Sequence, residues 1–407
     1  MMHMLKLYSV CLLTLTLSAC LPVLSGSAYA DNGPPLLTTH SGGNGAKIIL
    51  LQQPGLPTRA HMLGLQTTAE ALNAMEASGF TITTYDFETK IGTEYGLMKD
   101  AKPVSKEILK TQLGELPKGI TKEVYIEVIM DRPGELLDDG AWLTVTDNFI
   151  HLAEAAKELN ATGDYNFKGI VIDNEDYFSE IFNCDDYSSG GSCEDYKDKM
   201  FQRGKDIMRG VLEVWPNVIV THMHGPYTSD CDRPDYIAGV GVPCFDLKGS
   251  FFAGMVQAIS ETPGAHPLLN GGQDYVLASS NDFQKHHTYT EAMGDNNLDF
   301  IPENLRPAWA ANVETSFMVY NKRIARKAGG GSSIVFHTDL NEPRMQLENA
   351  RCVADSIVWF YIEDKPEAHW YYAMPDDWRE QVLEPALAHT CPDTSESATS
   401  EAVIEGQ

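Results

Sequence analysis

The chain has 407 residues, of which 43% are hydrophobic, and its formal net charge at pH 7 is −27. The hydrophobic share is sufficient for a large core. The negative charge argues against nucleic acid or anionic lipid as a partner, because no excess of Lys and Arg is present to neutralise phosphates. Such a charge is typical of a soluble protein in salty or extracellular medium.

The first thirty residues form a signal peptide by their composition. Lys6 is the only Lys, Arg, Asp or Glu among them, and residues 7–24 are almost entirely apolar. A short charged region followed by an apolar region is typical of a secretory signal, so residues 1–30 are left out of the fold. We therefore expect export from a bacterial cell, to the periplasm, to the outer membrane or to the medium.

Two cleavage sites compete within this segment. Residues 17–20 (LSAC) resemble a lipobox, which would make Cys20 a lipidated amino terminus, whereas residues 28–30 (AYA) suit ordinary signal peptidase and would leave Asp31 first. An uncleaved anchor is a third possibility. A lipid on Cys20 would be the only attachment to a membrane, because no later stretch is long and apolar enough to span a bilayer.

After a loose leader at residues 31–45, apolar runs alternate with amphipathic stretches. Strands alternating with helices imply βαβ units, and eight such units predict a single-domain α/β fold, a closed (β/α)8 TIM barrel over residues 46–390. An open doubly wound sheet is the alternative if a strand fails. The expected strands are Lys47–Leu51, Thr81–Tyr85, Glu123–Met130, Gly169–Ile172, Val218–Thr221, Pro267–Leu269, Ser333–Phe336 and Ile357–Ile362. The expected helices are Thr67–Ala77, Lys106–Leu113, Val145–Leu159, Tyr196–Val214, Phe251–Ser260, Glu303–Ala328, Arg344–Ala354 and about Pro375–Leu387. The acidic, polar tail 391–407 is predicted to be disordered.

Six cysteines follow the signal segment, an even number that suggests disulfides in an exported protein. Proximity along the chain favours Cys184–Cys193, Cys231–Cys244 and Cys352–Cys391, although six cysteines allow fifteen pairings. A metal site is a weaker interpretation, because no pair has CxxC spacing. The first two bridges would stabilise loops that follow strands.

The segment 167–178 (FKGIVIDNEDYF) is the most informative one. Its β-branched run ends abruptly in Asp173, Asn174, Glu175 and Asp176, at the carboxyl end of a strand, where α/β enzymes place their chemistry. Asp173 and Glu175 are two residues apart and therefore share one face of the strand. Two acids this close raise the proton affinity of one of them, as a general acid requires. The alternative is a pair held by Lys or Arg, or a helix cap.

Polar and aromatic residues also follow other expected strands, and this accumulation at one barrel end points to a site. Some have simpler explanations: Asp86 could cap a helix, and His222 and His224 could be satisfied buried histidines. The candidate substrate-binding residues are Asp86, His222, His224, Tyr227, Gln273, Asp274, His337, Trp359 and Glu363.

These residues resemble the catalytic positions of glycoside hydrolase barrels. The fourth strand of chitinase-like barrels reads Asp-Gly-x-Asp-x-Asp-x-Glu; aligned on Gly169, this chain keeps Asp173 and Glu175 but has Lys168 and Val171 where the first two acids belong. Asn174-Glu175 is similar to the Asn-Glu pair that ends strand four in clan A glycosidases. In that clan the nucleophile is a Glu ending strand seven, for which Asp339 stands nearest here and Glu342 lies further on. No single family is distinguished.

The resemblance implies an exported glycosidase acting on a poly- or oligosaccharide without a cofactor. Glu175 would be the general acid, Asp173 would tune it, and Trp359 would stack on a sugar ring. Asp339 would be the second carboxylate, with Glu342, Glu363 and Asp274 as alternatives. One alternative is a metal-dependent hydrolase that holds a divalent metal with Asp173, Glu175, His222, His224, His337 and Asp339. The other is a surface lipoprotein that binds carbohydrate without turnover.

Overall fold

The computed structural model describes residues 45–53, 69–83, 97–174, 181–223, 247–272, 277, 279–290, 301–326, 332–363 and 376–392. The signal segment, residues 31–44 of the leader, residues 393–407 and the predicted Cys231–Cys244 bridge lie outside these residues. Within the described part of the chain, no helix is both long and apolar enough to cross a membrane.

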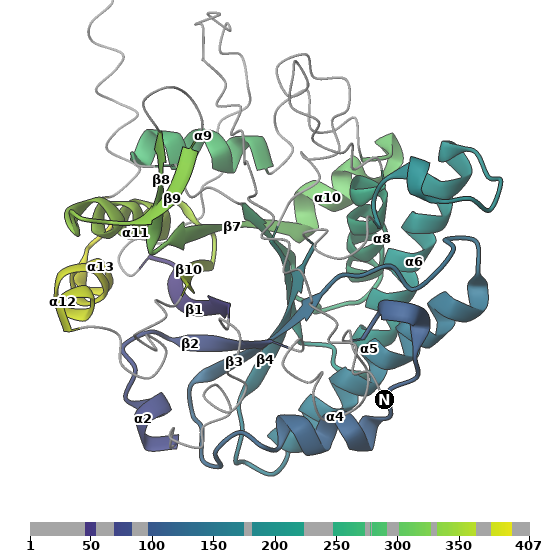
Figure 1. The fold of residues 1–407 in the computed structure, drawn as a ribbon, viewed down its shortest axis with the longest axis horizontal. Helices are drawn as coiled ribbons and strands as arrows, with labels where there is room; N and C mark the ends of the chain where they lie inside the picture. Colours follow the sequence, from purple (N-terminus) through teal and green to yellow (C-terminus); the bar gives the residue numbers. More distant parts are fainter. Residues whose placement is uncertain are drawn as a thin grey trace, which may run out of the picture.

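Eight parallel strands close into a barrel at the centre of the molecule (Figure 1), so the predicted (β/α)8 fold is confirmed. Their order around the barrel is β1-β10-β7-β6-β5-β4-β3-β2. The barrel strands are β1 (Lys47–Gln53), β2 (Gly79–Thr83), β3 (Glu123–Ile129), β4 (Phe167–Asp173), β5 (Ile219–His222), β6 (Leu268–Gly272), β7 (Val313–Tyr320) and β10 (Ile357–Glu363).

The seventh strand was predicted wrongly. Ser333–Phe336 belongs to β9 (Ser332–Phe336), which pairs antiparallel with β8 (Lys322–Arg326) in a hairpin outside the barrel (Figure 1). The barrel uses β7 instead, inside the stretch Glu303–Ala328 that was predicted as one helix. That stretch begins with the single turn η6 (Glu303–Leu305) and α10 (Arg306–Asn312), then turns into β7 at Val313.

The helices form a ring around the barrel, and their starts follow ordinary capping rules. Asp138 caps α5 through hydrogen bonds from the Gly140 and Ala141 amides, and Ser192 with Asp195 forms a capping box at the start of α6. The helices are α2 (Ala69–Asn73), α4 (Lys106–Leu113), α5 (Asp139–Asn160), α6 (Cys193–Val214), α8 (Lys248–Ser260), α9 (Ser280–Thr290), α11 (Asn341–Val353), α12 (Asp376–Trp378) and α13 (Glu384–Ala388). Short turns are η2 (Lys99–Ala101), η3 (Cys184–Asp186) and η7 (Arg379–Leu383).

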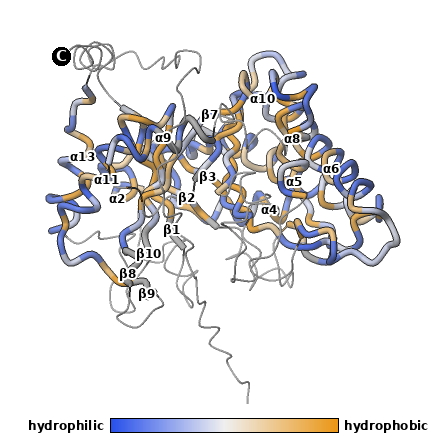
Figure 2. The backbone as a smooth tube through the Cα atoms, turned by 90° about the horizontal axis from the view of Figure 1, so that it is seen from above, coloured by the Kyte–Doolittle hydropathy of each residue, from blue (hydrophilic) through white to orange (hydrophobic). Residues whose placement is uncertain are grey.

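The core has two parts. The larger part lies between the strands and the helices, where Figure 2 shows hydrophobic segments facing each other and hydrophilic residues on the outer turns of α6 and α13.

Helices α6 and α8 approach each other closely at two glycines. A Cβ on Gly204 would lie 1.9 Å from the Phe251 carbonyl oxygen, and one on Gly254 would lie 2.0 Å from the Phe201 carbonyl oxygen. Only glycine permits this contact between backbones.

The smaller part fills the barrel interior, where alternate strands contribute side chains to successive layers. The strand register shifts by about one residue per strand around such a barrel. From the amino end, the register gives Ile49, Tyr125, Thr221 and Ser316, then Thr81, Val171, Gly271 and Trp359, then Leu51, Glu127, Met223 and Met318. The interior is therefore packed, and a candidate site is to be sought above it, at the carboxyl ends of the strands, where barrels of this kind place functional residues.

Hydrogen bonds and a disulfide join α11 to the residue before β1 and to the last helical segment. Arg351 of α11 is 5% exposed and donates from Nε to the Ala46 carbonyl at 3.0 Å, and from Nη1 to that of Ala386 in α13. The predicted disulfides Cys352–Cys391 and Cys184–Cys193 are both present. The first bridge fixes the end of the last helical segment to α11, and the second lies in the loop after β4.

Candidate active site at the carboxyl end of the barrel

Asp173 ends β4 and points into the barrel. It shares the strand face of Val171, which belongs to the interior cluster, whereas Ile170 and Ile172 pack against the helices. The residue is 0% exposed and pairs in register with Ile129 of β3. The strand therefore places a buried carboxyl at the base of the barrel mouth, as expected from the sequence. Glu175, two residues further on, lies outside the described residues.

A second buried carboxyl in the barrel was not predicted. Glu127 in β3 is 1% exposed and lies on the same strand face as Tyr125, which faces the interior. It pairs in register with Val171, so it lies one layer below Asp173 on the neighbouring strand. The alternation of Glu123, Tyr125 and Glu127 within an apolar strand is the sequence signal that could have identified it.

Aromatic side chains line the opposite wall. Tyr361 of β10 and Tyr320 of β7 pair in register, and their rings stack with centroids 4.7 Å apart. Strand β10 lies across the barrel from β4, because three strands separate them in either direction. The register places Tyr361 at the level of Asp173, so a tyrosine pair faces the carboxyl across the base of the mouth.

Trp359 does not occupy the mouth, where it was expected to stack on a sugar. Its indole is 1% exposed in the barrel core, makes an edge contact with Tyr125 at 5.2 Å, and donates from Nε1 to the Ser316 hydroxyl at 3.3 Å. The side chain lies two positions below Tyr361 on the same face of β10. Trp359 therefore supports the barrel, and Tyr361 takes the position at the mouth.

His222 faces away from the barrel interior, which agrees with the interpretation as a buried histidine and not with that as a residue of the mouth. It is 0% exposed, and its ring stacks on Phe252 of α8 with centroids 3.9 Å apart. The preceding residue, Thr221, takes the interior face and donates to the Leu269 carbonyl at 3.0 Å. Since neighbours along a strand point to opposite faces, His222 belongs to the layer between strand and helix.

His337 and Asp339 follow β9, the strand of the outer hairpin, so neither ends a barrel strand. The exposed Asp339 accepts hydrogen bonds of 3.0 Å from the amide nitrogen and the Nδ2 of Asn341, at the start of α11. The buried ring of His337 contacts Glu342 Oε2 at 3.1 Å and the edge of Trp378. Asp339 is therefore held by Asn341 beside the start of α11, and the seventh barrel strand ends in Tyr320 without a carboxylate.

The remaining predicted site residues lie outside what the structure describes. These are Glu175, Asp86, His224, Tyr227, Gln273 and Asp274, together with the side chain of Glu363.

The structure does not bring the described histidines of the proposed divalent-metal set together. His222 and His337 face different helices outside the barrel and do not converge on Asp173. Among the described residues, no group of three or more His, Cys, Asp or Glu side chains could hold a metal ion.

Loops after β3 and β4 are joined to each other beside the mouth. The Arg132 guanidinium lies 4.5 Å from the ring centroid of Tyr187 and bonds to Glu135 at 3.0 Å, and Glu135 accepts from the Ser188 amide at 3.1 Å. Burial raises the pKa of Glu135, but the hydrogen bonds from Ser188 and the charge of Arg132 outweigh it and keep this pKa below its ordinary value. Because Cys184–Cys193 closes the same loop, this wall of the site is held rigidly.

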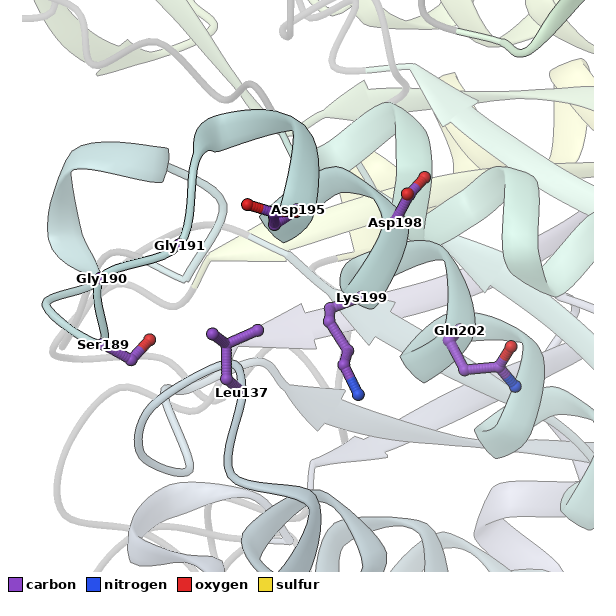
Figure 3. A pocket seen from close by; sticks show the side chains of 8 residues that line it. All are labelled: Leu137, Ser189, Gly190, Gly191, Asp195, Asp198, Lys199 and Gln202. Atoms are coloured by element: carbon purple, nitrogen blue, oxygen red, sulfur yellow. The ribbon is translucent and has the colours of Figure 1, made fainter.

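A surface cavity lies further out along the same loop, between the turn at residues 189–191 and the first turns of α6 (Figure 3). Leu137, Asp195, Asp198, Lys199 and Gln202 line it with that turn. Asp195 is already engaged by Ser192 in the capping box. The cavity lies on the flank of the barrel and contains none of the predicted site residues.

No family model matches the chain, and no curated protein does. Several solved structures are similar to it over most of their length. One is a β-mannanase from the blue mussel Mytilus edulis, with a TM-score of 0.42 and 11% identity over 85% of this chain and 94% of the other. Another is the catalytic domain of a family GH18 chitinase from the fern Peteris ryukyuensis, with a TM-score of 0.38 and 9% identity over 84% of this chain and 100% of the other. A third is an old yellow enzyme homologue from Zymomonas mobilis, with a TM-score of 0.38 and 12% identity over 85% of this chain and 93% of the other.

Proposed function

We propose that the protein is an exported glycoside hydrolase that cleaves a poly- or oligosaccharide at the carboxyl end of the barrel. The observation that carries the proposal is the position of Asp173: a buried carboxyl at the end of β4, pointing into a closed parallel barrel. Carboxyl ends of barrel strands are where enzymes of this fold place their catalytic residues. Glu175 follows two residues later in the sequence and supplies the acid.

In the proposed reaction Glu175 protonates the glycosidic oxygen as the bond to the anomeric carbon breaks. The anomeric carbon forms its new bond either to a second carboxylate, which water later displaces, or to a water that this carboxylate deprotonates. Asp173 lies beside it in sequence and sets its proton affinity, since a neighbouring carboxylate favours the protonated form. The stacked tyrosines Tyr320 and Tyr361, which are 4% and 8% exposed, lie opposite Asp173, and an apolar sugar face is proposed to meet their rings. No cofactor takes part in this chemistry.

Asp339 is not the second carboxylate of this proposal, because it follows the outer hairpin and accepts hydrogen bonds from Asn341 at the start of α11. Asp274 and Glu363 from the predicted strand ends remain candidates, and Asp173 itself is a third. A separation of about 5–5.5 Å between the two carboxyl groups would imply retention of configuration, and about 6.5–9.5 Å inversion.

The test is a screen of the purified exported protein against bacterial and algal polysaccharides, with release of reducing ends as the readout. We expect turnover of at least one polymer, unaffected by a chelator, and a loss of about a hundredfold or more in Asp173→Asn with unchanged thermal unfolding. Binding without turnover across the panel would support the carbohydrate-binding lipoprotein instead. Loss of turnover on chelation would support the metal-dependent hydrolase.

Export is also part of the proposal, and it rests on residues 1–30. The signal peptide would be removed either before Cys20, leaving a lipid-anchored protein, or after Ala30. Mass spectrometry of the mature amino terminus from cells distinguishes a diacylated Cys20 peptide from one that begins at Asp31, and recovery of an intact Met1 peptide would contradict cleavage at either site.

A further inference from the structure

We propose that the surface cavity beside α6 is a second carbohydrate-binding site, which takes a neutral stretch of polysaccharide outside the barrel mouth (Figure 3). The cavity has a volume of about 500 Å³, within the range of pockets that hold small ligands. The inference rests on the proposed function only for linking the ligand to the polymer that is cleaved. The cavity itself is built from Leu137, the turn at residues 189–191 and the first turns of α6.

One wall of the cavity is a stripe of polar side chains along α6. Asp198, Lys199 and Gln202 follow Asp195 by three, four and seven residues, so all four share one face of the helix. Seven residues of helix span about 10 Å, which suits an elongated ligand better than a single small ion. The stripe carries carboxylate acceptors, an ammonium donor and an amide that both donates and accepts. It therefore offers both kinds of hydrogen bond along its length.

The opposite wall is held in place by hydrogen bonds within the protein. Arg203 of α6 is 7% exposed and donates from Nη2 to the Leu136 carbonyl at 3.0 Å, which fixes the neighbouring Leu137 beside the helix. The Gly191 amide donates to the Tyr196 hydroxyl at 3.2 Å and so attaches the turn to α6. Because both walls are fixed in advance, binding a ligand between them costs little ordering of the protein.

The charges in the cavity select against an ionic ligand. An anion would meet the carboxylates of Asp195 and Asp198, and a cation would meet the Lys199 ammonium, which binds Asp139 at 3.1 Å. Hydrogen bonds from Arg203 and Lys199 hold the pKa of Asp139 below its ordinary value, so this ion pair persists at neutral pH. A neutral ligand that both donates and accepts hydrogen bonds is the class that fits.

Neighbouring hydroxyls of a sugar meet this requirement. One hydroxyl can donate to the exposed Asp198 carboxylate while the next accepts from the Lys199 ammonium. The half-buried side chain of Leu137 supplies an apolar contact for the C–H face of the same ring. Such a mixture of a few polar groups with an apolar surface is typical of small-molecule sites.

The position of the cavity connects it to the barrel mouth. Leu137 follows β3 and the turn 189–191 follows β4, and these two loops are joined beside the mouth through Glu135, which accepts from the Ser188 amide at 3.1 Å. A polymer held in the cavity stays close to the mouth, so its local concentration there rises without any new contact in the mouth itself. The cavity would therefore favour long chains over short substrates.

The first experiment is an NMR titration of the full exported protein with labelled leucine methyl groups, in the Asp173→Asn variant to suppress turnover. The neutral probes are cellohexaose, mannohexaose, xylohexaose and chitohexaose, and the charged probes are hexagalacturonate and the glucosamine hexamer. We expect at least one neutral probe to shift the Leu137 methyl signals and not those of Leu143, an exposed leucine of α5 outside the cavity. No shift at Leu137 with any neutral probe, or equal affinity for the charged probes, would overturn the proposal.

The second experiment removes one of the proposed hydrogen bonds. Asp198→Ala should weaken the affinity measured at Leu137 by about tenfold, since hydrogen bonds to charged groups are the stronger ones. Glu213→Ala, at an exposed glutamate near the other end of α6, is the matched control and should bind as the parent does. Unchanged affinity in Asp198→Ala, or an equal loss in both variants, would contradict the site. If Asp198→Ala lowers the thermal midpoint, Asp198→Asn replaces it with the same expected direction.

A kinetic comparison separates this inference from the proposed function. The ratio of kcat/KM on a polymer to kcat/KM on a short aryl glycoside should fall by about fivefold in Asp198→Ala, because only the polymer reaches both sites. A glycosidase with an unchanged ratio and an unchanged titration at Leu137 would refute the cavity site alone. A protein without turnover whose Leu137 signals still shift with a neutral probe would refute the proposed function and support the cavity as a carbohydrate site.

Discussion

The hydroxyl of Tyr125 donates a hydrogen bond of 2.9 Å to a carboxylate oxygen of Glu123, at the amino end of the barrel. The other oxygen of Glu123 receives the Lys47 ammonium at 2.7 Å. Burial first, and then the charge of Glu123, raises the pKa of Tyr125 far above its ordinary value. The base of the barrel is thus closed by a neutral phenol beneath the packed interior.

The raised pKa of Tyr125 predicts that the free energy of unfolding decreases at alkaline pH. The unfolded chain loses the Tyr125 proton near pH 10, whereas the folded chain keeps it, so the free energy of unfolding falls as pH rises above about 10. The contribution is about 1.4 kcal/mol per pH unit. Denaturant unfolding between pH 9 and 11 should show a shallower decline in Tyr125→Phe. Equal slopes in the two proteins would contradict the shift.

The close contact between α6 and α8 predicts a loss of stability when one of its glycines is replaced. Gly254→Ala places a methyl group against the Phe201 carbonyl oxygen, so α6 and α8 must separate, and we expect a loss of about 1–3 kcal/mol in the free energy of unfolding. Gly140→Ala in α5 is the matched control, because the nearest atom to its added Cβ is a side-chain oxygen of Asp138 at 3.3 Å. A loss in Gly254→Ala no larger than in Gly140→Ala would mean that the helices do not meet at this glycine.

Two aromatic residues of β10 should have separate effects. Tyr361→Ala removes the ring that stacks on Tyr320 at the mouth, and we expect KM to rise by up to about tenfold, since such a contact contributes about 0.5–1.5 kcal/mol. Trp359→Phe removes the hydrogen bond to Ser316 in the core, so it should lower the thermal midpoint without altering KM. A KM raised by Trp359→Phe and unaffected by Tyr361→Ala would restore Trp359 as the sugar-stacking residue.

Seven of the barrel strands follow from the sequence, because each overlaps a short apolar run between turn signals. Strand β7 could not be recognised in this way: Val313 follows α10 directly, without a glycine or proline to separate helix from strand. The Ser333–Phe336 run has the right composition, but composition does not reveal whether a strand pairs in the barrel or in a hairpin. Asp339 was assigned to the mouth for that reason alone.

Which face of a strand points into the barrel was equally hard to predict. In a parallel barrel both faces of a strand are apolar, so alternation does not reveal which one looks inward. His222 was therefore assigned to the mouth although the interior face of β5 belongs to Thr221. Trp359 was assigned to the right face but to the wrong depth, because the level of a residue in the barrel depends on the register of all eight strands. Asp173 lies at the carboxyl end of β4, where the sequence placed it, and the inward direction of its face follows only from the structure.

The most direct test of the central claim is the dependence of Glu175→Gln on the leaving group. A general acid is needed for a sugar alcohol leaving group and not for an activated aryl leaving group that departs as a stable anion. On the natural glycosidic bond we expect kcat to fall by about a hundredfold or more, while the first step on an activated aryl glycoside stays near the wild-type rate. Equal losses on both substrates, or no loss on either, would contradict the assignment of Glu175 as the acid at the barrel mouth.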